Sequence, residues 1–395
     1  MGVCTDHPPS SQRRLASMAL AFLVIFIFLL STLEYRVLSS TTPETKLISV
    51  ADHSHPARPN ITTVPYIPSK VEQYVFEHAL YHGYHSTEEH DLQPLCPLWT
   101  DANYTSPPGI LYEALNQYRV ELADYSHRVT TFQQQQPPLE DLRIALRQGL
   151  DHETVCRRVE LHEDGLAGIF SRSQMLSHGP FGVIEPLVQP LRHPEYCIRG
   201  VKRLMDISYL VHDFGALCRR LSAHSRIVFV DMGASLEFGG TGSPVLELLR
   251  LYRHFGFPMD HIYAYEINPT DPYFVFERVP QDQLLSYHWI NVGVNVDPTH
   301  RLNPLYQLLN GFTKDDVVIV KLDIDTPSIE LPLAQQLLND TRLHQLVDHF
   351  YFEHHVAMND ILASWKYDKV QGSFLDSLQL FAGLRQKGIA AHSWV

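Results

Sequence analysis

The sequence predicts an α/β fold whose second half is a Rossmann-like, doubly wound and mostly parallel sheet. Residues 317–322, VVIVKL, form an apolar run typical of a central parallel strand that is buried on both faces. Similar runs cover residues 227–230 and 261–265, and helical or turn patterns separate each run from the next. Alternation of strands and helices is typical of parallel sheets covered by helices.

The predicted elements follow in a regular order. The strand at 227–230 leads into Asp231 and a glycine-rich loop, and Ser243 and Pro244 then supply an N-cap and a first helical residue. Further strands are expected at residues 261–265, 287–296, 317–322, 350–352 and 389–394, with Gly388 ending the helix before the last one. Open α/β sheets bind ligands at the carboxyl ends of their strands, so polar residues there predict a site.

The first half of the chain is organised differently. Residues 15–33 carry no charge and span roughly 28 Å as a helix, close to one hydrocarbon core. Arg13 and Arg14 precede this segment, so the positive-inside rule predicts an uncleaved signal anchor at 15–35 with a cytosolic tail at 1–14. A cleaved signal peptide is the alternative. We expect a flexible stem at 36–70, a mainly helical lumenal region at 71–221 and the sheet domain at 222–395, in the Golgi or endoplasmic reticulum.

Composition agrees with a lumenal body. Three N-glycosylation sequons follow the predicted anchor, at Asn60, Asn103 and Asn339. Four of the five cysteines also follow it, namely Cys96, Cys156, Cys197 and Cys218. They permit two disulfides in an oxidising compartment, and three pairings stay open. The formal net charge of −13, without a long basic block, argues against a nucleic-acid partner.

Two segments predict a nucleoside site. Asp231 opens the turn VDMGAS, and Glu266 ends the next strand in YAYEINP. A carboxylate can accept two hydrogen bonds from the vicinal hydroxyls of a ribose, and glycine lets the backbone approach a ligand. Neither G-x-G-x-x-G nor a P-loop occurs. An acid at the end of the first strand would repel a pyrophosphate, but it suits a cationic nucleoside such as S-adenosylmethionine.

These segments resemble the FkbM type of class I S-adenosylmethionine-dependent methyltransferases. FVDMGAS resembles the first motif of that family, IYAYEINP its ribose-binding strand end, VVIVKLDIDTPSIE its K-I-D-V-E-G-x-E segment, and FYFEHHV its strand ending in Glu-x-His. The resemblance covers about the last 170 residues. It implies a cofactor, S-adenosylmethionine, bound by a set of residues near the first three strand ends: Asp231, Gly233, Ala234, Ser235, Glu266 and Asn291. The segment LEFGGTG looks like an insertion, and Thr326 and Pro327 depart from the family pattern.

The resemblance further implies that Asp323 faces the transferred methyl group. The expected reaction is O-methyl transfer to a glycan or small-molecule hydroxyl, by in-line displacement with catalysis mainly by positioning. Asp323, Glu353 and His355 are the candidates for a general base. We expect Glu353 and His355 to belong to a hydrogen-bonded cluster without metal. If a divalent metal binds, its expected ligands are Asp323, Asp325 and Glu353.

Two alternative functions stay open. Asp323-Ile324-Asp325 also matches the D-x-D motif with which glycosyltransferases hold a metal against a sugar nucleotide, and an anchor with a stem is usual in Golgi glycosyltransferases. That interpretation leaves VDMGAS and YAYEINP unexplained. The second alternative is an inactive methyltransferase fold that serves as a lumenal binding module.

Overall fold

The computed structural model describes residues 66–81, 84–88, 92, 94, 96–101, 110–160, 169–173, 182–188, 193–235, 243–358 and 370–395. The predicted tail and anchor, most of the predicted stem, and the sequons at Asn60 and Asn103 lie outside these residues, as does the inserted segment at 236–242. Among the helices of the described part, none is both long and apolar enough to span a membrane.

Six parallel strands form the main sheet. They are β3 (Ile227–Met232), β4 (His261–Tyr265), β5 (Tyr287–Ile290), β6 (Val317–Leu322), β7 (His349–Phe352) and β8 (Ala390–Ser393). Their order is β5-β4-β3-β6-β7-β8, which is the doubly wound order with its switch point between β3 and β6. Every residue of β3 and β6 is buried, as the apolar runs predict.

Two strand ends differ from the sequence prediction by two residues or more. β3 continues through Asp231 to Met232 because β6 pairs with it along its whole length. Asp231 therefore lies inside the strand and not beyond its end. β5 ends at Ile290, six residues earlier than expected. Just beyond it the N–H of Val292 donates a hydrogen bond to the carbonyl of Ile290. As an edge strand β5 pairs only with β4, so no second partner extends it.

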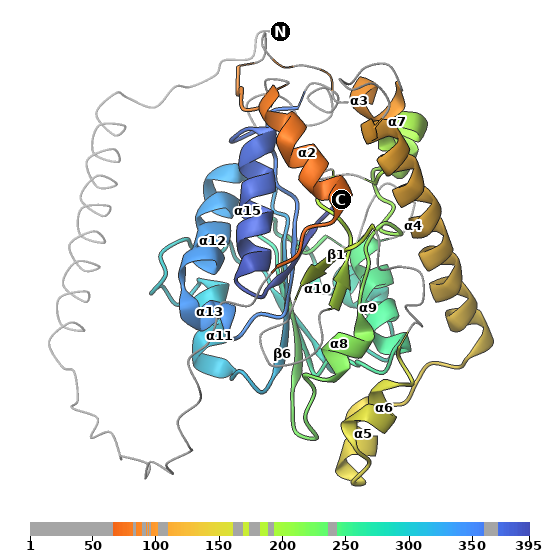
Figure 1. Ribbon diagram of the computed structural model, residues 1–395. Helices are drawn as coiled ribbons and strands as arrows, with labels where there is room; N and C mark the ends of the chain where they lie inside the picture. Colours follow the sequence, from red (N-terminus) through yellow and green to blue (C-terminus); the bar gives the residue numbers. More distant parts are fainter. Residues whose placement is uncertain are drawn as a thin grey trace, which may run out of the picture. The chain divides into compact units, whose positions relative to one another are not determined.

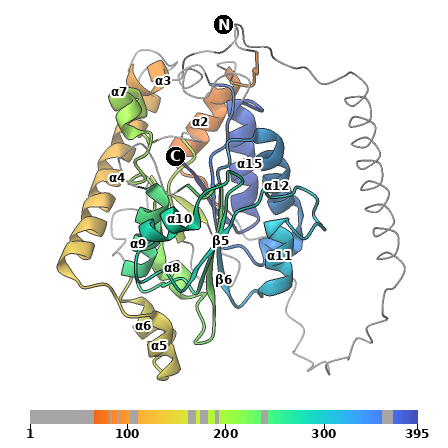
Figure 2. The same cartoon turned by 180° about the vertical axis from the view of Figure 1, so that it is seen from behind.

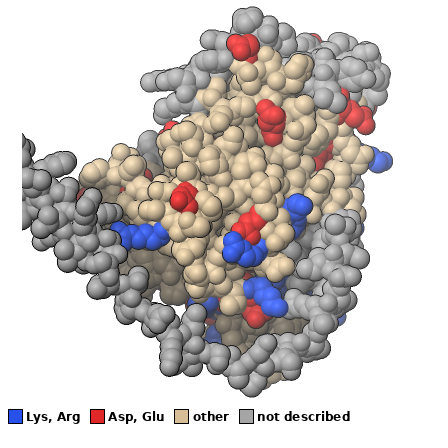
Figure 3. Space-filling view, turned by 90° about the vertical axis from the view of Figure 1, so that its left-hand side faces the viewer, with Lys and Arg blue, Asp and Glu red and all other residues tan. Residues whose placement is uncertain are grey.

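Helices cover both faces of the sheet (Figures 1 and 2). α9 (Pro244–His254) and α10 (Pro272–Arg278) lie on one side, and α11 (Pro304–Gly311), α12 (Pro327–Asn339), α13 (Thr341–His344) and α15 (Phe374–Gln386) lie on the other. Ser243 caps α9 as predicted, with its hydroxyl accepting from the N–H of Leu246. On the surface shown in Figure 3, acidic and basic side chains are intermixed and form no broad patch of one sign.

The region before the sheet is mainly helical, as predicted. Its helices are α2 (Lys70–Tyr81), α3 (Cys96–Thr100), α4 (Ile110–Gln135), α5 (Leu142–Arg147), α6 (His152–Cys156), α7 (Tyr196–Arg199), the 3-10 helix η3 (Gly200–Arg203) and α8 (Phe214–Cys218). A short antiparallel pair, β1 (Ser171–Ser173) and β2 (Gly182–Ile184), was not expected from the sequence. Two disulfides join Cys96 to Cys197 and Cys156 to Cys218, which selects one of the three pairings.

The helical region packs directly on the sheet domain. The ring of Phe255, which follows α9, stacks between Phe132 of α4 at 4.8 Å and Phe214 of α8 at 4.4 Å. The hydroxyl of Tyr209 donates a hydrogen bond to the carbonyl of Ser393 in β8. The described residues from 66 to 395 therefore belong to one compact unit.

Candidate functional site at the carboxyl ends of the strands

A cavity of about 580 Å³ lies at the carboxyl ends of the central strands. This is the switch point at which doubly wound sheets bind ligands, and the volume is within the usual range of roughly 300–1,000 Å³ for small-molecule sites. Four carboxylates line it, from Glu266, Asp323, Asp325 and Glu353. Among the described residues of its wall there is no lysine or arginine. The wall is therefore acidic.

The floor of the cavity depends on Gly233. This residue follows β3 with a φ of 89°, in the left-handed region that favours glycine. A Cβ atom at this position would lie 1.6 Å from the carbonyl oxygen of Asp323. Only glycine lets the turn after β3 and the turn after β6 approach this closely, and their contact brings both strand ends to one cavity.

Beneath the cavity, a buried lysine joins two strands. The Nζ atom of Lys321 in β6 lies 3.0 Å from a carboxylate oxygen of Asp231 and 3.0 Å from one of Asp323, and it donates to the carbonyl of Gly233 at 3.1 Å. Burial disfavours the charge of Lys321, but the two carboxylates outweigh this effect and raise its pKa. Burial raises the pKa of Asp231 to about 6, against the opposing effect of Lys321. Lys321 therefore holds both acids in fixed positions.

Asp323, Glu353 and His355 form a chain of titratable groups. Burial and the neighbouring Glu353 raise the pKa of Asp323 to about 6, while Lys321 opposes the shift. A nitrogen of His355 lies 3.0 Å from a carboxylate oxygen of Glu353. Burial lowers the pKa of His355, but the hydrogen bond and charge of Glu353 outweigh it, so the pKa is raised. The raised pKa of Asp323 brings its titration toward neutral pH, which suits acid–base chemistry.

The turn after β6 is held by Glu330 of α12. Its carboxylate accepts a hydrogen bond of 2.8 Å from the N–H of Ile324, and burial raises its pKa to about 7. Asp325, next in the turn, has a φ of 55° although it is not glycine. Asp tolerates this region better than most residues, but a non-glycine residue there is uncommon and is typical of functional turns.

The predicted site residues divide into two groups. Gly233, Ser235, Glu266, Asp323 and Glu353 line the cavity, together with Asp325. The others do not line it: Asp231, Ala234, Asn291 and His355.

For each residue of the second group, the structure shows another contact. The carboxylate of Asp231 is buried and lies 3.0 Å from the ammonium nitrogen of Lys321. The N–H of Ala234 donates to the carbonyl of Tyr265. The amide nitrogen of Asn291 donates to the carbonyls of Glu266 and Asn268, which holds the loop after β4. His355 supports Glu353.

A second cavity of about 470 Å³ adjoins the first. The two share Ser235, Glu266 and Asn268, and the second also includes the aromatic side chains of Phe274 and Trp289. Glu266 thus stands where a ribose could lie, with aromatic surface on one side for a flat base. Stacking on aromatic side chains is a common way to hold a base.

The sequence prediction of the site did not include two of its residues, Lys321 and Glu330. The signal for Lys321 was present, since a lysine within an apolar strand needs a buried counter-charge. Glu330 occupies the first turn of α12, where an acid is ordinary, so its inward orientation had no distinct signal in the sequence.

One group of side chains at the cavity could hold a metal. Ligand atoms of Asp325, Glu353 and His355 lie within 4.8 Å of one another. Asp323, which the sequence analysis names with Asp325 and Glu353 as a ligand if a metal binds, is not a member of this group, and its carboxylate lies 3.0 Å from the ammonium nitrogen of Lys321.

No family model, no curated protein and no solved structure matches the chain.

Proposed function

We propose that the protein is an S-adenosylmethionine-dependent methyltransferase that transfers a methyl group to an oxygen of a glycan or small molecule. The observation that carries this proposal is the acidic cavity at the switch point, with Glu266, Asp323 and Glu353 around the glycine turn at Gly233. The resemblance of the four strand-end segments to FkbM methyltransferases supports it.

The charge of the cavity favours this ligand over phosphate-containing ones. S-adenosylmethionine carries a sulfonium and an amino group and has no phosphate. The acidic wall of the first cavity, which has no described lysine or arginine, attracts such a cation and repels a diphosphate, and the basic side chain at the adjoining cavity is that of Arg278. In this arrangement, Glu266 would accept hydrogen bonds from the ribose hydroxyls, and Phe274 and Trp289 of the adjoining cavity would contact the adenine.

Asp323 and Glu353 are then the groups that meet the acceptor. An acceptor hydroxyl loses its proton as its oxygen attacks the methyl carbon, and the sulfur keeps the electron pair of the broken bond. Asp323, with a pKa of about 6, is suited to receive that proton near neutral pH. Its pairing with Lys321 fixes its position, and His355 does the same for Glu353. Such fixed geometry accelerates an in-line displacement.

The proposal includes a lumenal location on a type II membrane anchor. The two disulfides agree with an oxidising compartment. Asn339, the acceptor of the third sequon, is exposed as the last residue of α12. A glycan at this position would meet solvent.

A second candidate function is metal-dependent glycosyl transfer. It is favoured by the group formed by Asp325, Glu353 and His355, which could hold a divalent cation against a sugar nucleotide. It is disfavoured by the pairing of Asp323 with Lys321, because the first acid of the D-x-D motif is already neutralised. The third candidate is an inactive binding module, which would bind S-adenosylmethionine, the same ligand as the proposed methyltransferase.

Calorimetry with S-adenosylmethionine, and separately with a sugar nucleotide plus Mn²⁺, tests the proposal. We expect binding of S-adenosylmethionine that persists with chelator. Glu266→Gln should weaken it by roughly tenfold or more, as expected for loss of a charge-assisted hydrogen bond. Glu277→Gln, an exposed change in α10 outside both cavities, is the matched control. If the protein binds the sugar nucleotide in the presence of Mn²⁺ and does not bind S-adenosylmethionine, the methyltransferase proposal is contradicted.

A further inference from the structure

The cavity at the strand ends has two sides that differ in chemistry. The strand order separates them, because the loops after β4 and β5 border one side and the chain after β6, β7 and β8 borders the other. Glu266 and Asn268, which the adjoining cavity shares, lie on the first side. In the proposed function the first side holds the nucleoside, so the second side is left for the methyl acceptor. We call the second side the acceptor side.

Aliphatic side chains dominate the acceptor side, and they come from three separate parts of the chain. Leu204 and Met205 belong to the helical region, Ile324 and Ile329 to the turn after β6 and the start of α12, and Val395 follows β8. The polar side chains of the acceptor side are those of Asp323, Asp325, Thr326 and Glu353. A mostly apolar wall with a few polar groups is typical of pockets that bind small molecules.

The polar groups of the acceptor side are better suited to accept hydrogen bonds than to donate them. Ionised carboxylates only accept, and the hydroxyl of Thr326 already donates to the carbonyl of Ile324 at 3.2 Å. The backbone N–H groups of Asp323 and Glu353 also donate elsewhere, to backbone carbonyls of the neighbouring strands. Such a wall matches a ligand that donates a hydrogen bond, as an acceptor hydroxyl does.

A glycan fits this wall poorly. The ring and glycosidic oxygens of a glycan only accept hydrogen bonds, and each of its hydroxyls both donates and accepts. Buried polar groups that lack a partner cost free energy, so a carbohydrate needs donors that the described side chains of the acceptor side do not supply. A single hydroxyl on an apolar body leaves few such groups to satisfy.

Leu204 and Met205 are held in place from both directions along the chain. Arg203, just before them, lies 2.8 Å from a carboxylate oxygen of Glu195 and also pairs with Asp206, just after them. The disulfide of α7 ties the same stretch of chain to α3. Residues 203–206 therefore form a braced loop.

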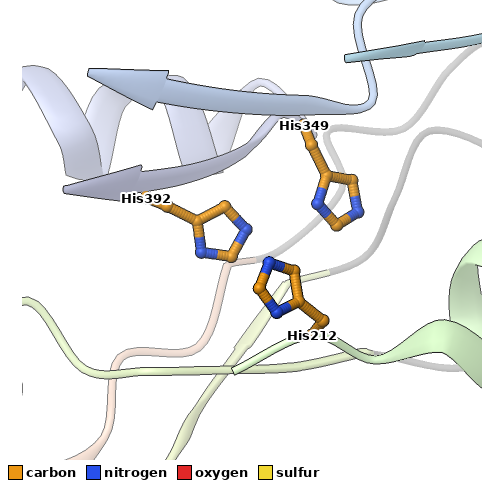
Figure 4. Close-up of side chains that lie close together, drawn as sticks. All are labelled: His212, His349 and His392. Carbon is orange, nitrogen blue, oxygen red and sulfur yellow. The ribbon is translucent and has the colours of Figure 1, made fainter. Parts of the chain in front are cut away.

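The segment that follows the braced loop is docked on β7 and β8. The hydroxyl of Tyr209 donates to the carbonyl of Ser393 at 2.7 Å. Farther along, His212 meets His349 of β7 and His392 of β8 in a histidine cluster whose members are each at most 2% exposed. Figure 4 shows the imidazole of His212 turned toward the other two, and its ring centroid lies 5.2 Å from that of His392. Because β7 and β8 end at the acceptor side, this docking places the braced loop there.

We propose that Leu204 and Met205 determine which acceptors the protein methylates, and that these acceptors carry their hydroxyl on an apolar body without an anionic group. The inference rests on the proposed methyl transfer and extends it, because it names the class of acceptor. It also assigns a role to the helical region. The sheet domain supplies the charged groups of the cavity, and the helical region supplies part of the apolar wall that faces them.

Charge and apolar contact both favour this class of acceptor. Four carboxylates line the cavity and its described wall has no lysine or arginine, so an anionic acceptor is repelled. Each methylene group that the aliphatic wall removes from water tightens binding by up to about fourfold. A three-carbon chain in contact with this wall should therefore tighten binding by about tenfold or more.

The test compares four small probes by calorimetry, with the full-length protein in detergent and protein-free detergent as the blank. Phenol and 4-propylphenol differ only in the apolar chain, 3-(4-hydroxyphenyl)propionate adds a carboxylate, and methyl β-D-glucoside has a polar body. S-adenosylhomocysteine, which lacks the transferable methyl group, is present throughout. We expect 4-propylphenol to bind about tenfold more tightly than each of the other three probes. Equal affinities for 4-propylphenol and methyl β-D-glucoside would overturn the proposal.

Two variants test the role of the braced loop. Met205→Gln and Leu204→Asn replace an apolar side chain with a polar one of similar size. Each should weaken the binding of 4-propylphenol by about fivefold or more and keep the affinity for S-adenosylmethionine within about twofold. Leu285→Asn, at a fully exposed leucine outside both cavities, is the matched control and should change neither affinity. If Met205→Gln and Leu204→Asn bind 4-propylphenol as tightly as the wild type does, the proposal is wrong.

The same measurements distinguish a failure of this inference from a failure of the proposed function. If S-adenosylmethionine binds but the probes do not follow the expected order, methyl transfer stands and the acceptor class is wrong. If S-adenosylmethionine does not bind, the probes are compared without cofactor. A preference for 4-propylphenol that Met205→Gln removes would then support the apolar pocket, and the absence of that preference would contradict it. The wild-type series needs no variant, so the test does not depend on variants that fail to fold.

Discussion

The ammonium nitrogen of Lys321 lies 3.0 Å from a carboxylate oxygen of Asp323, so the acid at the end of β6 reaches the cavity already paired. The same ammonium group contacts Asp231 on the neighbouring strand. One buried cation therefore sets the position and charge of two carboxylates. The acids that the sequence places at separate strand ends act as one unit.

Replacing this lysine should be costly for stability. Lys321→Met keeps the length of the side chain but leaves two buried carboxylates without their counter-charge. We expect the free energy of unfolding to fall by about 3–5 kcal/mol, as when one partner of a buried ion pair is removed. Denaturant titration measures this change. Lys314→Met, at an exposed position, should be nearly neutral, and an equally small effect at Lys321 would contradict a buried ion pair.

Gly233→Ala should abolish ligand binding at the strand ends. The added Cβ atom would collide with the carbonyl of Asp323, and the backbone would have to leave its left-handed conformation. We expect loss of S-adenosylmethionine binding together with a drop in melting temperature. Gly311→Ala, where a Cβ atom would meet nothing within 4 Å, is the matched control. Unchanged binding in Gly233→Ala would mean that the ligand does not approach this turn.

Asp323→Asn and Asp325→Asn should have different effects. The side chain of Asp323, beside the proposed reacting centre, is 10% exposed, whereas that of Asp325 is 65% exposed. We expect methyl transfer to fall at least tenfold more in Asp323→Asn than in Asp325→Asn. Activity assays with either substitution, with and without chelator, measure this. If both variants lose activity equally, and if Mn²⁺ restores activity to the chelator-treated wild type, the glycosyltransferase alternative is favoured.

The stability of the protein should depend on pH through Glu330. Burial raises its pKa to about 7 from an ordinary value of 4.5, so the folded protein holds this proton more tightly than the unfolded chain. The resulting stabilisation is complete below about pH 4.5 and disappears as the pH rises through about 7. Glu330→Gln keeps the acceptor for the N–H of Ile324 and removes the titration. Relative to the wild type, the variant should gain about 2 kcal/mol between pH 5 and pH 8.

Chemical denaturation at several pH values tests this expectation. The charge of Glu330 also raises the pKa of His355, so the difference between the two proteins reports the titration of Glu330 together with its effect on this neighbour. A difference that stays constant over the pH range would show that Glu330 ionises normally in the folded protein.

Much of the fold follows from local sequence patterns. Apolar runs located β3, β4 and β6, and the cap at Ser243 located the start of α9, because strand burial and helix capping depend on residues close together in the chain. The order of the strands, β5-β4-β3-β6-β7-β8, is the arrangement expected for a doubly wound sheet. The hairpin of β1 and β2 was missed because three-residue strands carry almost no periodic signal.

The sequence by itself determined that carboxylates would gather at the carboxyl ends of the strands, because parallel strands end at a common edge. Only the tertiary structure decided their individual roles. Asp231 is buried against Lys321 since β6 extends the pairing of β3 past it, while Glu266 remains on the wall of the cavity. The histidine cluster was likewise beyond sequence reasoning: His212, His349 and His392 are up to 180 residues apart, and such contacts depend on how the helical region packs against the sheet.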